Sequence, residues 1–372
     1  MRIMVIAGEA SGDLHGAGVV RELKRRDSDC DIYGIGGDKM QAAGMELIYH
    51  VRELSVMGFW EIVQHLPLLH SVERTLTVLL KARKPDVLLL VDYPGFNLRF
   101  AHVARTLGIN IVYYISPQVW AWNPGRARKM KGLVDKMLVV FPFEVDFYKT
   151  QGIDVEFVGH PLLEVLNEPQ DRQAFCKRYG FEDNKPIVGL FPGSRQQEIE
   201  RIFPAMLGAA RILQAQRGAQ VAVGVSSLFD FDFIKSFIRD DFSVQLIQHS
   251  TYDVMKNSDI ALVTSGTATL ETAYYQTPMI VVYKTSWLTY LLARSLIRIK
   301  HIGLVNIVAG KQLVPELLQR RVNPQQLADE ALRLLCDDGL RRQMSNNLSI
   351  IREKLGSSGA SVRVAETILS FA

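Results

Sequence analysis

The second half of the chain contains a glycine-containing segment of a kind that binds phosphate. FPGSR, residues 191–195, includes the end of the apolar run Ile187–Phe191, which is about one strand long. Gly193 and Ser194 could present backbone N–H groups to a phosphate, and Arg195 could bind the same group through two hydrogen bonds. The segment therefore predicts an anion site at the end of a strand.

A second such segment, TSGTATLE at Thr264–Glu271, follows another apolar run and opens a helical pattern. Ser265, Gly266 and Thr267 lie where the first N–H groups of a helix have no intrahelical partner, so a diphosphate would be stabilised there. Glu271, one turn further on, could accept hydrogen bonds from a ribose diol. The alternative is ordinary helix capping by Ser265 or Thr267. Two such segments in one half of the chain favour a ligand over capping alone.

The first apolar run leads into a third glycine-containing segment, GEASGD at Gly8–Asp13. A strand, a glycine turn and a helix N-terminus together form a natural anion site. The spacing of Gly8 and Gly12 is not that of the GxGxxG motif of nicotinamide-binding proteins, and the chain contains no Walker A motif. The alternative is a tight strand-to-helix turn that uses glycine for backbone reasons only.

The elements that must position these segments follow from the hydrophobic pattern. Runs rich in Val and Ile alternate with helical patterns along the chain, and each run is apolar throughout rather than alternating. Such runs suit parallel strands covered on both faces, so we expect an α/β, doubly wound architecture. The strands expected on this basis are 3–7, 87–91, 111–115, 137–140, 155–158, 187–191, 221–225, 260–263 and 279–283.

The alternation restarts after a polar, proline-containing stretch at residues 159–170, where we place a linker. Two sheets joined by a hinge leave a cleft, and ligands of open α/β sheets bind beyond the carboxyl ends of the strands. The sequence therefore predicts two domains, one over residues 1–164 and one over residues 165–349.

The composition excludes several classes of protein. Apolar residues make up 48% of the 372 residues and charged residues 22%, the balance of an ordinary globular chain. The formal net charge of +4 is too small to indicate a nucleic-acid partner. Cys30, Cys176 and Cys336 lie too far apart for a disulfide framework or a cysteine-rich zinc site. Without a secretory signal or a long apolar stretch, we expect a cytoplasmic protein, soluble or on a membrane surface.

Two segments have the composition of a membrane-surface or acyl-chain site. The stretch 57–69 is unusually apolar for a connection, and its alternative is a buried core helix. The stretch 284–315 is basic, carries aromatic residues and contains no acidic residue; its alternative is a solvated basic face. We expect an anionic membrane surface as a partner and the inner membrane as the location. The residues that carry this prediction are Met57, Phe59, Trp60, Trp287, Arg294 and Arg298.

Several motifs occur in a fixed order. They are GEASGD (8–13), VMG (56–58), DYPGFN (92–97), SPQVWAW (116–122), FPGSR (191–195), TSGTATLE (264–271) and the Asn306…AGK…VPELLQ segment through Gln319. In this order they resemble the lipid-A-disaccharide synthase family, bacterial glycosyltransferases of lipopolysaccharide synthesis. The resemblance runs from residue 1 to about residue 320 and more weakly to the end. FPGSR and TSGTATLE alone would indicate only a nucleotide-sugar enzyme, whereas SPQVWAW with GEASGD is more specific.

The resemblance implies a GT-B fold, in which two Rossmann-like domains face a cleft. It implies UDP-2,3-diacylglucosamine as the donor and 2,3-diacylglucosamine 1-phosphate (lipid X) as the acceptor. The product would be a β-1,6-linked tetraacyl disaccharide 1-phosphate, formed with inversion and without a metal or other cofactor. Residues 1–164 would bind the acceptor and 165–349 the donor. The terminal segment 350–372 would pack back on the first domain, although packing on a partner subunit of a homodimer is also open.

Inverting transfer needs a base, and Asp92 at the end of the strand Val87–Val91 is our candidate. Asn97 would help to hold it. The alternative role for Asp92 is to cap the turn before the next helix, and Glu9 and His15 are rival bases. Some family members carry a second Asp where this chain has Gly95, a position that cannot supply a base here.

The residues themselves predict most of the remaining contacts, and the resemblance adds that of Asn306. Arg195 and the helix N-terminus at 265–267 would meet the charge that develops on UDP. Asn306 would contact the diphosphate or the donor sugar, although Val305 stands where the family often has Pro. Glu316 would assist or form a salt bridge, and His160 is expected to be structural. The acceptor side is expected at Glu9, Ser11, Gly12, Asn97, Gln118 and Trp120.

Three other functions remain open from the sequence. A UDP-N-acetylglucosamine 2-epimerase or a peptidoglycan N-acetylglucosaminyltransferase would share the fold, and an epimerase would turn over its donor without an acceptor. A non-catalytic protein that binds sugar nucleotides or lipids would bind UDP without transfer. A nucleic-acid-binding protein is disfavoured, because the basic runs are local and lack a stacking or groove-reading motif.

Overall fold

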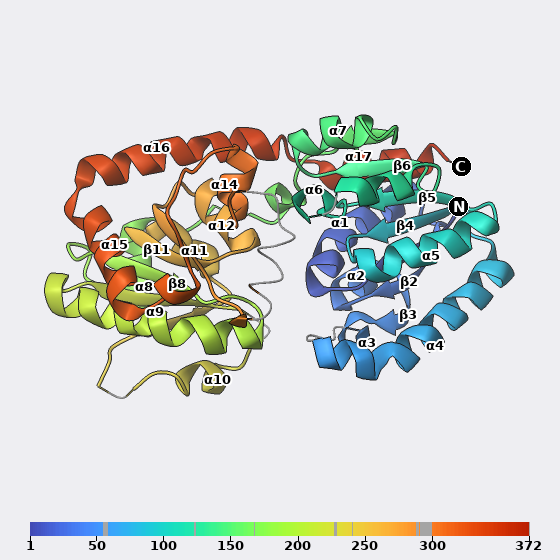
Figure 1. The fold of residues 1–372 in the computed structure, drawn as a ribbon. Coiled ribbons are helices and arrows are strands. Elements are labelled where there is room, and N and C mark those ends of the chain that lie inside the picture. The colour runs from blue at the N-terminus through green and yellow to red at the C-terminus, as the bar shows by residue number, and fades with distance from the viewer. Residues whose placement is uncertain are drawn as a thin grey trace. The chain divides into compact units, whose positions relative to one another are not determined.

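The computed structural model describes residues 1–54, 59–122, 124–166, 168–226, 229–239, 241–287, 290 and 300–371, without the side chains of residues 59–66 and 122. The chain divides into two compact units. Unit 1 comprises Met1–Val165 and Leu355–Ala372, and unit 2 comprises Leu166–Lys354. Each unit is built on its own parallel sheet (Figure 1). The predicted α/β, doubly wound architecture is confirmed for both.

Unit 1 contains a seven-stranded sheet in the order β3-β2-β1-β4-β5-β6-β7. Its strands are β1 (Arg2–Ala7), β2 (Asp31–Gly36), β3 (Glu46–His50), β4 (Val87–Val91), β5 (Asn110–Tyr114), β6 (Lys136–Val139) and β7 (Val155–Phe157). Its helices are α1 (Ala10–Arg26), α2 (Asp38–Ala42), α3 (Val51–Leu54), α4 (Phe59–Arg83), α5 (Pro94–Thr106), α6 (Val119–Trp122), α7 (Pro142–Lys149) and α17 (Ala360–Leu369), with 3-10 turns at Pro124–Met130 and Pro161–Glu164.

The core of unit 1 explains why its strands are apolar throughout. On one face of the sheet, Met4 and Leu88 pack against Leu76 of α4 and Phe100 of α5. α1 packs against the C-terminal helix α17 (Figure 1). The Glu164 carboxylate accepts hydrogen bonds from the backbone N–H and the hydroxyl of Ser361, which fastens the start of α17 within unit 1.

Unit 2 contains a six-stranded sheet in the order β10-β9-β8-β11-β12-β13. Its strands are β8 (Ile187–Phe191), β9 (Gln220–Val225), β10 (Gln245–Gln248), β11 (Ile260–Thr264), β12 (Met279–Tyr283) and β13 (Glu316–Leu318). Its helices are α8 (Arg172–Tyr179), α9 (Gln196–Arg217), α10 (Phe231–Lys235), α11 (Thr251–Asn257), α12 (Thr267–Tyr274), α14 (Leu304–Ala309), α15 (Pro324–Cys336) and α16 (Asp338–Leu355), with a 3-10 turn at Gln319–Arg321.

The strand order places a topological switch point in each sheet. β1 pairs with β2 on one side and β4 on the other, and β8 pairs with β9 and β11 in the same way. Successive connections leave such a strand in opposite directions, so the loops at its carboxyl end part and open a space for ligands. Among the residues that the structure describes, no helix is both long enough and apolar enough to cross a membrane.

Candidate active site

In unit 2, the two predicted anion segments begin side by side at the switch point. Phe191 at the end of β8 pairs with Val263 of β11. The loop after β8 turns at Gly193, whose φ is +112°. A Cβ on Gly193 would lie 2.8 Å from a Glu198 carboxylate oxygen and 3.4 Å from the Thr264 methyl. Only glycine suits this backbone and this close approach, so the two loops meet at one point of the sheet.

Beyond Gly193 the chain presents exposed polar residues. Ser194 and Arg195 are both exposed, and Arg195 is the N-cap of α9. One guanidinium nitrogen, Nη1 of Arg195, lies 3.5 Å from Oε1 of Glu198, whose pKa is raised by burial. The sequence did not indicate Tyr283, at the end of β12, as a neighbour of Glu198. Burial raises the pKa of Tyr283, and the charge of Glu198 raises it further. The ion pair with Glu198 therefore keeps the arginine beside the loop.

The loop after β11 leads into the N-terminus of α12. Gly266 is the N-cap and Thr267 is exposed. Among the described residues, no atom would lie within 4 Å of a Cβ on Gly266, and the first N–H groups of a helix have no partner within the helix. Ser265 has a structural contact, because its hydroxyl donates to the Ile302 carbonyl over 2.9 Å. An anion at this loop would therefore bind mainly to the backbone N–H groups at the start of α12, and less to the Ser265 hydroxyl.

Glu271 lies one turn into α12 in a half-buried position. Burial raises the pKa of its carboxyl group to about 7. Tyr252 on α11 donates its hydroxyl to Oε1 of Glu271 over 3.5 Å, a weak contact that the sequence did not indicate. A carboxylate held by one long hydrogen bond keeps acceptor capacity for a further donor, such as a sugar hydroxyl.

Asn306 is fully buried, and its amide group is saturated. Its Oδ1 accepts from the N–H groups of Leu313 (2.7 Å) and Val314 (3.1 Å), and its Nδ2 donates to the Val314 carbonyl (2.9 Å) and to Glu316 (2.7 Å). Glu316 also accepts from the N–H groups of Ile302 and Gly303. Through these bonds, Asn306 and Glu316 fasten the segments before and after α14. The expected contact of Asn306 with a donor stays a prediction.

In unit 1, Asp92 ends β4 in an uncommon backbone conformation. Asp92 and Tyr93 both have positive φ, at +48° and +49°. The Asp92 carbonyl accepts hydrogen bonds from Nδ2 of Asn97 (2.7 Å) and from the hydroxyl of Tyr113 (2.6 Å), and both donors are fully buried. Two consecutive left-handed residues other than glycine are costly and need such fixed partners. Asn97 therefore acts on the backbone of Asp92 from inside the unit.

The loop after β1 packs directly onto this turn. A Cβ on Gly8 would overlap the ring of Tyr93, so glycine is needed for close packing. Glu9 is the N-cap of α1. Burial raises the pKa of Tyr93, and the nearby charge of Glu9 raises it further. Ser11 is exposed and Gly12 is buried against β1. The GEASGD and DYPGFN segments thus meet at the switch point of unit 1.

Three buried polar residues in unit 1, namely Asp13, His15 and His160, make contacts within the protein. The buried Asp13 accepts from the N–H groups of Gly37, Lys39 and Met40, and so caps α2. Burial lowers the pKa of His15 to about 4 and that of His160 to about 3, so both rings are neutral at pH 7. The rings pack edge-to-face with centroids 6.3 Å apart. The packing of His160 fits the structural role expected for it.

The SPQVWAW segment follows β5, the neighbour of β4. Ser116 and Trp120 donate hydrogen bonds to Oε1 of Glu144 over 2.7 and 3.0 Å. Glu144 is buried, which raises the pKa of its carboxyl group to about 7. Gln118, between the two donors, is exposed. Glu144 carries no recognisable motif, so the sequence did not indicate it.

Comparisons with known proteins decide the family. Residues 3–365 match the family model described as lipid-A-disaccharide synthetase. The chain is 43% identical over 370 residues to the lipid-A-disaccharide synthase of Geobacter metallireducens, covering 99% of this chain and 96% of that protein. It is 44% identical over 371 residues to the enzyme of the same name from Syntrophus aciditrophicus, covering 99% and 97%.

The chain belongs to the lipid-A-disaccharide synthase family. It is accordingly a glycosyltransferase of lipid A biosynthesis, as its motifs predicted.

Solved structures share the fold of this synthase family at low sequence identity. The UDP-N-acetylglucosamine 2-epimerase of Neisseria meningitidis, bound to UDP-N-acetylglucosamine, superposes with a TM-score of 0.65 at 16% identity, over 100% of each chain. The glycosyltransferase of kitacinnamycin superposes with a TM-score of 0.65 at 15% identity, over 100% of this chain and 98% of the other. The predicted GT-B class, with two Rossmann-like domains, is confirmed.

The predicted membrane residues of this synthase are only partly described. Met57, Arg294 and Arg298 lie outside the described residues, as do the side chains of Phe59 and Trp60. Trp287 is 57% exposed, with the Arg320 guanidinium 5.5 Å from its ring centroid. An exposed indole stacked with a cation matches the expected composition of a surface site, but membrane contact stays a prediction.

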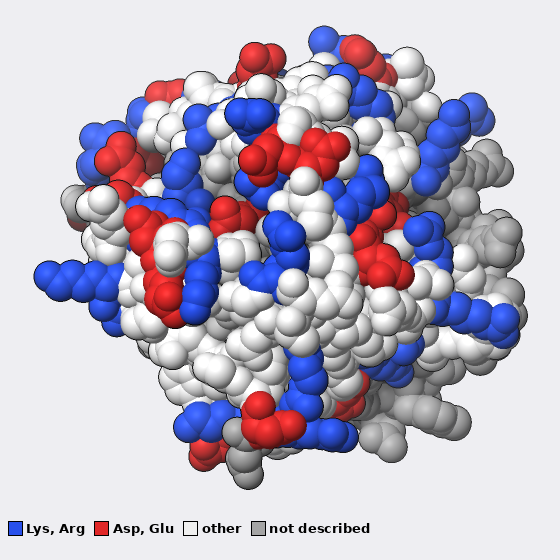
Figure 2. Space-filling view, turned by 90° about the vertical axis from the view of Figure 1, so that its left-hand side faces the viewer, with Lys and Arg blue, Asp and Glu red and all other residues white. Residues whose placement is uncertain are grey.

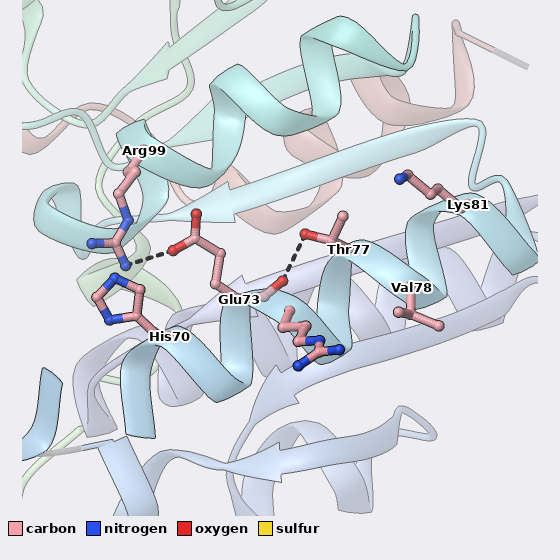
Figure 3. A pocket seen from close by; sticks show the side chains of 7 residues that line it. His70, Glu73, Thr77, Val78, Lys81 and Arg99 are labelled. Atoms are coloured by element: carbon pink, nitrogen blue, oxygen red, sulfur yellow. Dashed lines mark hydrogen bonds and ion pairs between the residues drawn. The ribbon is translucent and has the colours of Figure 1, made fainter. Parts of the chain in front are cut away.

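A groove of about 490 Å³ lies between α4 and α5 (Figure 3). Its lining is mainly basic, with one carboxylate and one exposed apolar side chain. Arg99 of α5 points to Glu73 of α4 and pairs with it over 2.8 Å, while Lys81 lies further along α4. The lining residues are His70, Glu73, Arg74, Thr77, Val78, Lys81 and Arg99.

The charge of unit 2 is mixed on the face that Figure 2 presents, where Lys and Arg alternate with Asp and Glu. Unit 2 contains ion pairs such as Arg211–Asp241 (2.8 Å) and Arg333–Glu330 (2.6 Å). In the described part of the chain, no group of three or more His, Cys, Asp and Glu is arranged to hold a metal ion.

Proposed function

We propose that this synthase transfers 2,3-diacylglucosamine from UDP-2,3-diacylglucosamine to the 6-hydroxyl of lipid X, with inversion and without a metal ion. The observation that carries the proposal is that the Gly193 loop and the loop leading into α12 leave the adjacent strands β8 and β11, with Gly193 packed close to Thr264 at the end of β11. Backbone N–H groups from two loops at one point are suited to a diphosphate.

Unit 2 would hold the donor. The N–H groups around Gly193 and those of the first turn of α12 would bind the two phosphates. Arg195 would neutralise the charge that UDP acquires as the glycosidic bond breaks, and Glu271 would accept hydrogen bonds from the ribose diol. The likeness in fold to an epimerase bound to UDP-N-acetylglucosamine supports this placement at the level of the fold.

Unit 1 would hold the acceptor and supply the base. The Asp92 carboxylate would take the proton of the 6-hydroxyl as that oxygen bonds to the anomeric carbon, and UDP would leave with the electrons of the broken bond. The two hydrogen bonds that fix the Asp92 backbone support this role, because a base must be held within reach of the proton it removes. Glu9, Ser11, Gln118 and Trp120 would contact lipid X from the neighbouring loops.

We also propose that the protein binds the anionic inner surface of the membrane, since both substrates carry acyl chains. The groove between α4 and α5 supports this, because Arg74, Lys81 and Arg99 bring cationic groups to one place near the exposed side chain of Val78. Vesicle sedimentation tests it. Binding to phosphatidylglycerol vesicles at low salt that is lost with neutral vesicles supports the proposal, and equal binding to both contradicts it.

Release of UDP tests the reaction. The assay uses UDP-2,3-diacylglucosamine in detergent with EDTA, with and without lipid X. The proposal predicts release that depends on lipid X and persists in EDTA, together with a tetraacyl disaccharide 1-phosphate seen by mass spectrometry. Turnover of UDP-N-acetylglucosamine without an acceptor would instead identify an epimerase, and loss of release in EDTA would contradict metal-free transfer.

A further inference from the structure

One buried carboxylate fastens the loop after β5 to α7. Oε1 of Glu144 accepts from the Ser116 hydroxyl over 2.7 Å and from the Trp120 indole over 3.0 Å. Only 2% of Glu144 is exposed to solvent. Water cannot replace the hydrogen bonds of an acceptor that binds two donors in a buried site, so the positions of Ser116 and Trp120 depend on this side chain.

Helix capping explains only half of these contacts. Glu144 occupies the third position of α7, where its Oε2 accepts from the N–H of Phe141, the N-cap residue, over 3.1 Å. That bond is the ordinary function of a glutamate at this position. Capping needs one oxygen only, whereas the other oxygen binds two side chains of a segment more than 20 residues earlier in the chain.

Further contacts from α7 hold the same loop. The Tyr148 hydroxyl donates to the Pro117 carbonyl over 2.7 Å, and the rings of Trp120 and Phe143 pack edge-to-face with centroids 5.0 Å apart. The loop leaves β5 directly beside the proposed base, since the N–H of Asp92 donates to the Tyr114 carbonyl over 3.0 Å. α7 therefore sets where the loop stands relative to Asp92.

We infer that Glu144 is a positioning residue for the acceptor: through Ser116 and Trp120 it holds the 116–122 loop in the arrangement that binds lipid X. The inference rests on the proposed function, which places lipid X on unit 1. Gln118, exposed between the two anchored residues, and Trp120 are the side chains presented to the acceptor. Because the donor site is built from unit 2, loss of the anchor changes acceptor binding and leaves donor binding unchanged.

The test is the Glu144→Gln variant with steady-state kinetics for both substrates. Glutamine has one acceptor oxygen where glutamate has two, so it cannot cap α7 and also accept from Ser116 and Trp120. We expect the KM for lipid X to rise about tenfold, the equivalent of one hydrogen bond to a charged group, with the KM for the donor within about twofold of wild type.

Two further variants keep the test decisive. Trp120→Phe removes one donor and retains an aromatic ring, and combined with Glu144→Gln it should raise the KM for lipid X less than the product of the single effects, because both act on one contact. Glu164→Gln is the matched control. It also replaces a unit 1 carboxylate that accepts two hydrogen bonds, but those bonds come from Ser361 at the start of α17 and not from the 116–122 loop. Its KM for lipid X should equal that of wild type.

The results separate the two claims. If wild type shows no acceptor-dependent UDP release, the proposed function fails. If wild type is active and the KM for lipid X is unchanged in Glu144→Gln, the role of Glu144 fails alone. The role of Glu144 also fails if the melting temperature of Glu144→Gln falls and both KM values rise equally, because that result would show a general structural role. It fails as well if the effects of Glu144→Gln and Trp120→Phe on the KM for lipid X multiply fully in the double variant.

Discussion

The hydroxyl of Tyr113 donates a hydrogen bond to the backbone carbonyl of Asp92 over 2.6 Å. Tyr113 lies on β5 and Asp92 directly follows the neighbouring strand β4, and Asn97 donates to the same carbonyl from α5. Both donors are fully buried, so they cannot exchange this acceptor for water. The contact therefore maintains the positive φ of Asp92 and the direction in which its carboxylate leaves the sheet.

Tyr113→Phe should lower the kcat of transfer about fivefold, because one of two bonds that hold the Asp92 carbonyl is lost, at about 1 kcal/mol. Donor binding, measured by calorimetry with UDP, should not change. Tyr114→Phe is the matched control: the Tyr114 hydroxyl is buried with no hydrogen-bond partner among the described residues. Equal kcat values for the two variants would contradict the positioning role of Tyr113.

Gly8→Ala should destabilise unit 1 by about 2 kcal/mol, because the added methyl group overlaps the Tyr93 ring in a tightly packed turn. Thermal unfolding followed by circular dichroism measures this as a fall in melting temperature. Gly95→Ala serves as the control, since a Cβ at Gly95 in α5 would meet no atom within 4 Å among the described residues. Its melting temperature should stay level or rise slightly, and an equal fall in both variants would refute the close packing of Gly8 on Tyr93.

Asn306→Ala should raise the Kd for UDP and lower the melting temperature. It leaves the buried N–H groups of Leu313 and Val314 and the carboxylate of Glu316 without their partner, at about 1–3 kcal/mol for each unpaired group. Asn347→Ala, at an exposed position of α16, is the control for a lost asparagine. If Asn306→Ala changed UDP binding with no loss of stability, direct contact with the donor would be the better account.

The difference in free energy of unfolding between wild type and the Glu144→Gln variant should become less favourable to wild type as pH rises from 5 to 8. Burial raises the pKa of Glu144 to about 7 in the folded state, above the ordinary value of 4.5. Between these two values the folded state binds the extra proton, so the free energy of unfolding decreases with rising pH, by on the order of 3 kcal/mol in all. Urea unfolding of both proteins at several pH values measures the difference, in which other titrating groups cancel. Parallel pH profiles would show that Glu144 does not titrate in this range.

The sequence predicted well what depends on apolar runs and loop motifs. β4, β8 and β12 coincide with the runs 87–91, 187–191 and 279–283, because strands of a parallel sheet are buried on both faces and contain few polar residues. β2, with its two glycines, β3, β10 and the short β13 were missed, because their runs are polar, short or interrupted. The FPGSR and TSGTATLE segments were each predicted to follow a strand, as they do, whereas the pairing of β8 with β11 that brings them together came from the structure.

Roles that depend on tertiary hydrogen bonds could not be predicted in this way. Asn306 lies in a motif, but its side-chain amide forms hydrogen bonds with the segment that follows α14. Asp13 caps α2, a helix that begins more than 20 residues later. Glu144 has no motif at all, and only the packing of α7 against the loop after β5 brings it to Trp120. Such partners are distant in sequence, and periodicity carries no information about them.

The most direct test of the central claim, that Asp92 is the base for transfer from a donor held by unit 2, is the activity of Asp92→Asn. Asparagine tolerates positive φ as well as aspartate does, so the turn should be retained while the base is removed. The account predicts that the Kd for UDP is unchanged and that lipid X-dependent UDP release falls at least about 100-fold. Release within a few-fold of wild type, with UDP still bound normally, would contradict it and move the base to Glu9 or His15.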